Sequence, residues 1–140
     1  MAGYSGTPLP KKLGIKTDHR VALLHAPANF METLGALPDG VTLLRKLDRK
    51  PVNVVLLFVR SSADLAAQFS PTNAALDHDG GLWVAWPKKS SGVKTDLTED
   101  TIRVLGLECG LVDNKVCAVD GTWSGLRFMY RLKDRPRRAV

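Results

Sequence analysis

Cysteine is scarce in this chain, with only Cys109 and Cys117 among 140 residues. Two cysteines are too few for the disulfide framework that holds small secreted domains together. They also lack the C-x-x-C spacing of a redox pair, and they fall in an expected helix and an expected strand. We therefore expect both to be small, buried apolar side chains in a reduced, cytoplasmic protein.

Long hydrophobic runs are absent as well. The longest apolar run, Val54–Val59, is far too short to cross a bilayer. The first eight residues contain no charged segment followed by an apolar one, so no secretory signal is visible there. We expect no membrane partner.

Acidic residues are fewer than basic ones, 14 against 20, which gives a net charge of +6. The excess is concentrated at the end of the chain, where residues 131–140 carry five basic side chains and Asp134 as their single acid. We expect residues 133–140 to form a basic, solvated tail. Arg135–Arg138 would add weak, salt-dependent attraction for a polyanion such as RNA.

Several catalytic signatures are missing. No G-x-x-x-x-G-K-[ST] phosphate loop occurs, and no G-x-S-x-G turn surrounds Ser61 or Ser62. His19, His25 and His78 are scattered without metal-ligand spacing. Ser61 with His25 as its base is conceivable, but helix capping accounts for the hydroxyl. We assign no catalytic residue, metal or cofactor, and we favour binding over catalysis while leaving enzyme activity open.

The composition that remains is that of an ordinary globular protein, with 44% apolar and 24% charged residues. A chain of this length buries a core as one domain. We therefore expect a single domain over residues 1–132, of which 1–17 are partly loop. Apolar, β-branched segments predict strands at His19–His25, Val41–Leu44, Val52–Val59, Leu82–Trp86, Lys115–Asp120 and Gly125–Leu132.

Helices are predicted between these strands. Short helical turns are expected at Pro10–Gly14 and Phe30–Leu34. Ser61–Asp64 has the hydroxyls and the acid of a helix start, and Pro71 should bend or restart that helix. Gly80-Gly81 should break the chain before the next strand.

A last helix should begin at Asp96 as N-cap, with Glu99 completing a capping box, and end near Gly110. This order of elements predicts an α/β fold in three layers. Its sheet should be Rossmann-like, mixed and mostly parallel, and should end in an antiparallel hairpin.

Three stretches resemble a bacterial family of uncharacterised proteins, a domain of unknown function. They are Gly3–Lys16, Leu82–Lys89 and Asp113–Phe128. The resemblance extends from about Gly3 to Leu132 and implies no activity.

A looser likeness is to the Rossmann-like fold of class I methyltransferases, whose later half resembles Val52–Leu132 in its order of elements. The turn His25–Phe30 lacks the glycines of their cofactor motif, and Arg45-Lys46 stands where an acid would hold a ribose.

Ligands of open α/β sheets bind outside the carboxyl ends of the strands. Three strand exits matter if their strands are parallel neighbours: His25–Asn29, Arg60–Ser62 and Trp86–Gly92. In the third exit, lysines flank Ser90-Ser91-Gly92 just before a helix, which suits an anion. A solvated loop is the plainer interpretation, and a capping Asp96 would oppose an anion. The candidate ligand-binding residues are Lys88, Lys89, Ser90, Lys94, Arg60, Ser61, His25 and Asn29.

We therefore expect a binding module without catalysis, for an anionic ligand such as a nucleotide or RNA. One alternative is a degenerate methyltransferase-like enzyme with His25 or Asn29 near its ligand. Another is a protein-interaction domain that uses the face of the terminal hairpin around Trp123. An exposed Trp123 beside Arg127 and Tyr130 would suit base stacking, but packing within the hairpin is the simpler account of this tryptophan. Trp83 and Trp86 are three residues apart on one strand and should face opposite sides of the sheet.

Overall fold

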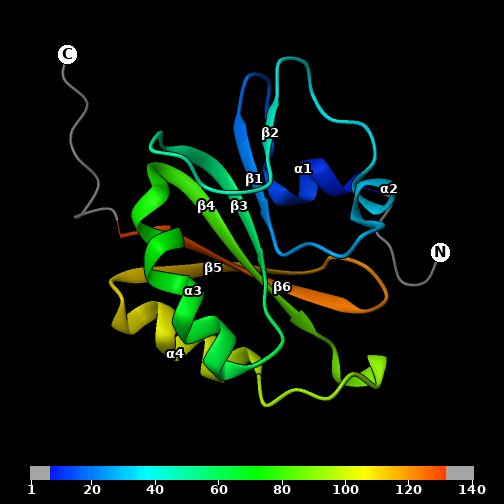
Figure 1. The fold of residues 1–140 in the computed structure, drawn as a ribbon, viewed down its shortest axis with the longest axis vertical. Helices are drawn as coiled ribbons and strands as arrows, with labels where there is room; N and C mark the ends of the chain where they lie inside the picture. Colours follow the sequence, from blue (N-terminus) through cyan, green and yellow to red (C-terminus); the bar gives the residue numbers. More distant parts are fainter. Residues whose placement is uncertain (1–6, 132–140) are drawn as a thin grey trace.

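A computed structural model describes residues 7–131, so the predicted basic tail lies outside the described residues (Figure 1). The elements in chain order are α1 (Leu9–Leu13), β1 (Arg20–Leu24), α2 (Phe30–Leu34), β2 (Thr42–Leu44), β3 (Val52–Phe58), α3 (Ser62–Ala75), β4 (Leu76–Pro87), the 3₁₀ turn η1 (Lys89–Ser91), α4 (Glu99–Glu108), β5 (Leu111–Ala118) and β6 (Trp123–Tyr130).

The strands form one six-stranded sheet in the order β2-β1-β3-β4-β6-β5. β1 pairs in parallel with β2 and β3, and β3 pairs in parallel with β4. β6 runs antiparallel to both β4 and β5. The sequence-based prediction of a single α/β domain with a mixed, mostly parallel sheet and a terminal hairpin is therefore confirmed.

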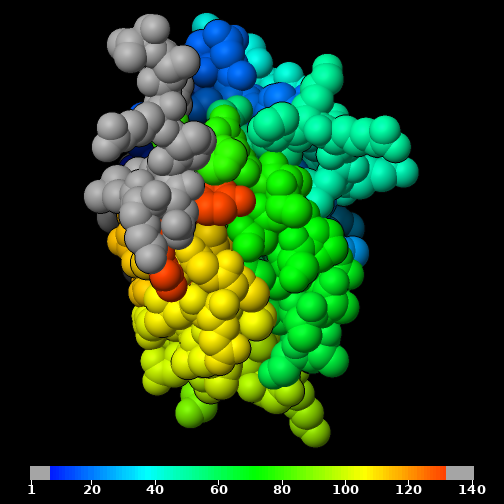
Figure 2. Space-filling model, turned by 90° about the vertical axis from the view of Figure 1, so that its left-hand side faces the viewer, coloured from blue at the N-terminus to red at the C-terminus, as the bar shows by residue number. Residues whose placement is uncertain are grey.

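Helices cover both faces of this sheet and complete three layers. α3 and α4 lie side by side on one face (Figures 1 and 2), where Phe69 of α3 and Ile102 of α4 join one apolar cluster. Leu13 of α1 and Phe30 of α2 belong to a second cluster on the opposite face. A helix on each side explains why β3 is apolar along nearly its whole length.

The two tryptophans of β4 illustrate the alternation of side chains along a strand. Trp83 packs into the α1/α2 cluster and Trp86 into the α3/α4 cluster, as their spacing predicts. The indole N–H of Trp83 donates to the carbonyl of Leu13 at 3.0 Å, so α1 is hydrogen-bonded to the sheet.

The expected break at Gly80-Gly81 is wrong, because β4 begins at Leu76 and continues through both glycines. The register against β3 shifts instead: Leu76 pairs with Val52, and the next pair is Gly81 with Val54. β4 therefore carries three more residues than β3 over this interval, which forms a bulge. A Cβ on Gly80 would stand 2.6 Å from the carbonyl oxygen of Asn53, so glycine lets the two strands approach here.

Pro71 neither restarts nor ends α3, which runs as one helix from Ser62 to Ala75. Phe69 and Thr72 are buried on either side of the proline, and the Thr72 hydroxyl donates to the carbonyl of Gln68 at 2.7 Å. Packing of the buried face of α3 keeps the helix continuous, although Pro71 has no backbone N–H to donate.

The start of α4 also differs from the prediction. The N-cap is Thr98, whose hydroxyl accepts from the N–H of Thr101 at 3.2 Å, and the Thr101 hydroxyl accepts from the N–H of Thr98 at 3.0 Å. The capping box is thus formed by two threonines rather than by Asp96 and Glu99. The predicted end is confirmed, since Gly110 follows the C-cap with a φ of 92°.

Both cysteines are half-buried rather than fully buried, because Cys109 caps the end of α4 and Cys117 lies in the edge strand β5. Burial raises the pKa of the Cys117 thiol. Within residues 7–131, no helix is both long and apolar enough to cross a membrane.

Candidate functional site

The carboxyl ends of β1, β3 and β4 lie on one edge of the sheet, since these strands are parallel neighbours. The three exits considered in the sequence, at His25, Arg60 and Trp86, therefore share that edge. β3 stands between β1 and β4, so the first and third exits are separated by roughly 10 Å. The loop after β4 projects from this end of the molecule (Figures 1 and 2).

The loop after β4 is ordered by its own hydrogen bonds. Lys88 precedes the η1 turn, and its carbonyl accepts from the Ser91 hydroxyl at 2.6 Å. The same hydroxyl accepts from the N–H of Val93 at 3.2 Å, and Gly92 ends the turn in the left-handed region with a φ of 78°. Ser91 thus stabilises the loop, whereas Ser90 is exposed.

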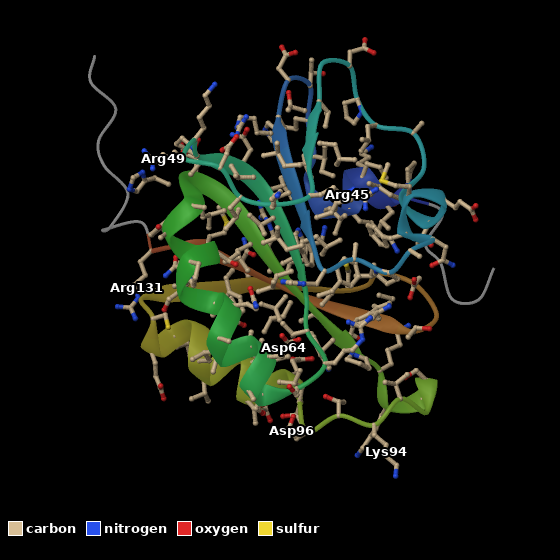
Figure 3. All side chains as sticks on the ribbon, in the orientation of Figure 1. Arg45, Arg49, Asp64, Lys94, Asp96 and Arg131 are labelled. Carbon is tan, nitrogen blue, oxygen red and sulfur yellow. The ribbon has the colours of Figure 1, made fainter. Side chains whose placement is uncertain are left out.

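The second half of this loop is attached to the start of α3. The Thr95 hydroxyl donates to the carbonyl of Arg60 at 2.7 Å, and Asp96 accepts from the N–H of Ser62 at 2.8 Å. The bond from Ser62 holds the pKa of the Asp96 carboxyl below its ordinary value. Figure 3 shows Asp64 and Asp96 toward this end of α3, with Lys94 extending away.

A hollow of about 510 Å³ lies between the end of β4, this loop and the start of α4. Its wall includes two candidate residues, Lys89 and Lys94. The same wall contains apolar side chains, hydroxyls and carboxylates that the sequence did not single out as ligands: Trp86, Pro87, Val93, Leu97, Thr95, Thr98, Asp96 and Glu99. We call this space the carboxyl-edge hollow.

The two acidic side chains on the wall, Asp96 and Glu99, interact with residues outside the hollow. Asp96 bonds Ser62 of α3, and Glu99 pairs with Arg103 one helical turn further along α4. None of the ion pairs recorded among residues 7–131 involves Lys89 or Lys94. Among the described residues, the two ammonium groups on the wall therefore form no recorded ion pair with these neighbouring carboxylates.

Arg60 and Ser61 stand next to the hollow but have structural contacts of their own. Ser61 is the N-cap of α3, and its hydroxyl accepts from the N–H of Asp64 at 3.1 Å, as the sequence predicts. The guanidinium of Arg60 lies over the ring of Trp123, 5.1 Å from its centroid. This cation–π contact directs the arginine toward the opposite cluster of the sheet.

Trp123 is not the exposed aromatic that the interaction-domain alternative needs. It is only 5% exposed and packs edge-on against Phe58, with ring centroids 5.0 Å apart. Arg127 and Tyr130 are an odd number of residues apart on β6, so they face opposite sides of the sheet. The three side chains therefore do not form one surface.

His25, Asn29 and Lys88 are not among the residues that line the hollow. His25 and Asn29 are exposed at the exit of β1, where His25 has a positive φ of 59°. Lys88 is half-buried, and its N–H donates to the carbonyl of Thr122 in the β5–β6 turn at 2.7 Å. The loop thus directs Lys89 and Lys94 to the hollow and attaches Lys88 to the neighbouring hairpin.

Of the contacts that the sequence interpretation missed, the Thr98 cap of α4 has a detectable sequence pattern. Thr98 precedes Glu99-Asp100 and stands three residues before Thr101, which is a capping pattern as good as the one assigned to Asp96. With Thr98 as the N-cap, Asp96 has no capping role in α4, which agrees with its bond to Ser62. That bond joins residues 34 positions apart, and no local pattern predicts it.

Metal-ligating side chains and the hydroxyl of Ser61 were also considered in the sequence. Among residues 7–131, no group of three or more His, Cys, Asp or Glu side chains is arranged to hold a metal ion. The Ser61 hydroxyl is engaged in capping, which is the role that its position at the helix start predicts. The hollow combines cations, carboxylates, hydroxyls and apolar surface.

No protein-family model matches the chain, and no curated protein matches it either. Among solved structures, it is similar to a SAM-dependent methyltransferase from Aquifex aeolicus, with 17% identity, a TM-score of 0.53, and coverage of 86% of this chain and 87% of that one. A structure of LepI in complex with SAM has 13% identity and a TM-score of 0.47. A structure described as a pericyclic reaction enzyme has 14% identity and a TM-score of 0.46.

The alignments to the last two structures cover 89% of this chain and 47% of each of them, so the chain spans about half their length. The likeness to the Aquifex structure agrees with the looser resemblance noted in the sequence. At 17% identity it concerns the path of the backbone. The chain has the Rossmann-like fold found in that methyltransferase.

Proposed function

We propose that this chain is a binding module for a small anionic ligand of the nucleotide class, held in the carboxyl-edge hollow. The observation that carries the proposal is the pair Lys89 and Lys94 on the wall of a hollow of about 510 Å³. A volume of this size is typical of small-molecule sites.

Lys89 and Lys94 supply two ammonium groups that can bind phosphate oxygens in this hollow. The charge of Glu99 is balanced by Arg103, whereas Asp96 bonds the N–H of Ser62 and keeps a negative charge that opposes an anion. The N-terminal end of α4 adds the positive end of a helix dipole at the same wall.

Apolar surface favours a nucleotide over bare phosphate. Val93, which is 44% exposed, stands on the wall together with the largely buried Trp86 and Pro87. Removing such surface from water stabilises a base or a similar flat group in contact with it. RNA is a weaker candidate, because the hollow is a local feature of a size that suits a small molecule.

The affinity test compares two double charge reversals by calorimetric titration with ATP. Lys89→Glu/Lys94→Glu should weaken binding by about tenfold or more, since two charge-assisted contacts are replaced by repulsion. Arg49→Glu/Lys50→Glu is the matched control, because it changes the net charge equally at two exposed side chains before β3 and should leave the affinity nearly unchanged. Equal losses of ATP affinity in both variants would show that only the overall charge matters, and would contradict the site.

A second candidate function rests on the fold. The Aquifex structure is described as a SAM-dependent methyltransferase, and its likeness to this chain favours trying S-adenosylmethionine as a ligand. Against it, the β1 exit Ala26-Pro27-Ala28 contains no glycine to let the backbone approach a cofactor. Saturable amide shifts at Ala26–Asn29 with S-adenosylmethionine would favour this candidate, and none at millimolar ligand would exclude it.

A further inference from the structure

A second hollow, of about 520 Å³, lies at the opposite edge of the sheet, where β3 and β4 begin. Its walls come from the loop between β2 and β3, the C-terminal end of α3 and the start of β4. The loop spans residues 45–51, and Figure 3 shows Arg49 toward the end of α3 at which β4 begins. We call this space the amino-edge hollow. Its volume is typical of a small-molecule site.

Much of the lining of the amino-edge hollow is aliphatic. Six apolar residues from three segments contribute to it: Leu47, Pro51, Pro71, Ala74, Ala75 and Leu76. Pro51, Pro71 and Ala74 are exposed, so apolar surface there is in contact with water. Among the described residues that line the hollow, only His78 has an aromatic ring, and it packs against Tyr130 with ring centroids 5.1 Å apart. The wall therefore suits an aliphatic chain, whose burial against it removes apolar surface from water.

The loop between β2 and β3 supplies the cations. Its four basic side chains, Arg45, Lys46, Arg49 and Lys50, are all exposed. None of the ion pairs recorded within residues 7–131 includes any of these four. Arg49 and Lys50 line the hollow, so two cations stand beside the aliphatic wall.

The single acid of this loop, Asp48, is bound to Arg20 of β1. Nη2 of Arg20 donates to Oδ1 of Asp48 at 2.6 Å, and Nε donates to the carbonyl of Pro51 at 3.1 Å. The N–H of Lys50 donates to the same carboxylate at 2.9 Å. The hydrogen bond from Arg20 holds the pKa of the Asp48 carboxyl below its ordinary value. Arg20 therefore balances the charge of Asp48, and the loop keeps the excess positive charge of its own basic side chains.

Asp77 is the other carboxylate on the wall, and its charge opposes an anion. It accepts from the N–H of Asp79 at 3.3 Å and from the side-chain amide of Asn53 at 3.5 Å. Asp77 belongs to β4, whereas Arg49 and Lys50 belong to the loop. An anionic group is therefore favoured on the loop side of the hollow.

We propose that the amino-edge hollow binds a small amphipathic anion, with its aliphatic chain on the apolar wall and its anionic head at Arg49 and Lys50. Two independent observations carry the two halves of this ligand: exposed aliphatic residues from separate segments, and cations without a recorded ion pair in the described part of the chain. Carboxylate and phosphate heads share the required chemistry, since both accept charge-assisted hydrogen bonds.

The primary test is an amide-shift titration of the labelled full chain with butanoate, hexanoate and octanoate. Octylammonium, which has the chain of octanoate and the opposite charge, is the matched probe. We expect saturable shifts at Arg49, Lys50 and Leu76, with affinity rising about threefold for each added methylene. Octylammonium should bind at least about tenfold more weakly than octanoate. No saturable shift with octanoate up to about 50 mM, or equal affinities for octanoate and octylammonium, would overturn the proposal.

Two further probes distinguish the sources of such an anion. Octyl phosphate replaces the carboxylate head by a phosphate, and the tighter binding of octanoate or octyl phosphate names the head group that the hollow prefers. Vesicles of anionic phospholipid test a membrane surface instead. Shifts that appear only with vesicles, and with neither free anion, would overturn the small-molecule site.

A pair of variants tests the cationic side of the hollow. Arg49→Gln/Lys50→Gln should weaken octanoate binding by about tenfold. Lys11→Gln/Lys16→Gln removes the same charge at two exposed side chains outside the hollow and should leave the affinity nearly unchanged. Equal affinities of the two variants would contradict the assigned position of the head group.

A second pair tests the aliphatic wall. Ala74→Glu puts a carboxylate on the wall and should also weaken octanoate binding by about tenfold. Ala67→Glu is the matched control, because Ala67 is exposed on the same helix, seven residues earlier, and does not line the hollow. If both variants bound octanoate as the wild type does, the chain would have to lie elsewhere and the proposal would be wrong.

The proposed nucleotide site is tested separately, because it lies at the other edge of the sheet. ATP has no aliphatic chain for the amino-edge hollow, so Arg49→Glu/Lys50→Glu still serves as the control for ATP binding. Shifts at Lys89–Lys94 report on the nucleotide site, and shifts at Arg49, Lys50 and Leu76 report on this one.

Discussion

Asp96 accepts a hydrogen bond from the backbone N–H of Ser62 at 2.8 Å, although 34 residues separate them. The bond satisfies a donor in the first turn of α3 with a side chain that arrives from the loop after β4. It therefore stabilises a helix start and fixes one wall of the carboxyl-edge hollow at the same time.

This bond predicts a pH-dependent contribution to stability. Because the folded-state pKa of Asp96 lies below its ordinary value of 3.8, the carboxylate stabilises the fold above that pH, and the contribution is lost as pH falls through the folded-state pKa. Asp96→Ala should therefore lower the melting temperature at pH 7, and its difference from the wild type should narrow below about pH 4. Asp39→Ala, at an exposed turn, is the control. A difference in melting temperature that stays constant down to pH 2 would show that the ionised Asp96 carboxylate does not cause it.

Gly106 brings α4 close to the sheet. A Cβ there would collide with the ring of Phe128, which is fully buried. Gly106→Ala should therefore destabilise the protein by about 1–3 kcal/mol through overpacking, although alanine favours a helix. Gly121→Ala, with no atom within 4 Å of the new Cβ, should change stability by less than about 0.5 kcal/mol. Urea unfolding of both variants measures the contrast, and equal stabilities would contradict the close packing.

Trp123 is expected to contribute to the stability of the fold. Trp123→Ala should lose about 3–5 kcal/mol of unfolding free energy, because it removes a buried ring that packs on Phe58. Val116→Ala on the neighbouring strand β5 should cost little, since Val116 is 48% exposed. If Trp123→Ala were as stable as the wild type, the ring would have to be outside the core.

The sequence was informative where a pattern reflects burial. The continuous apolar run of β3 and the antiparallel hairpin follow from local composition, because a strand between two helical layers needs apolar side chains on both faces. The common edge of the three strand exits follows from parallel pairing.

The errors arose where a tertiary contact overrides a local preference. Asp96 has the residue type of an N-cap, but α3 competes for its carboxylate, and Thr98 caps α4 instead. Gly80-Gly81 looks like a chain break, but the glycines let Asn53 and Arg127 approach the strand. Each of these partners is distant in sequence.

The most direct measurement of the central claim is an amide-shift titration of the labelled full chain with ATP at low and moderate salt. S-adenosylmethionine and a short RNA serve as comparison ligands. We predict saturable ATP shifts at Lys89–Lys94 and Thr95–Glu99 that persist at moderate salt in the wild type and are absent in Lys89→Glu/Lys94→Glu. Shifts confined to residues 131–140 that vanish with salt would contradict a nucleotide site and attribute the binding to the basic end of the chain.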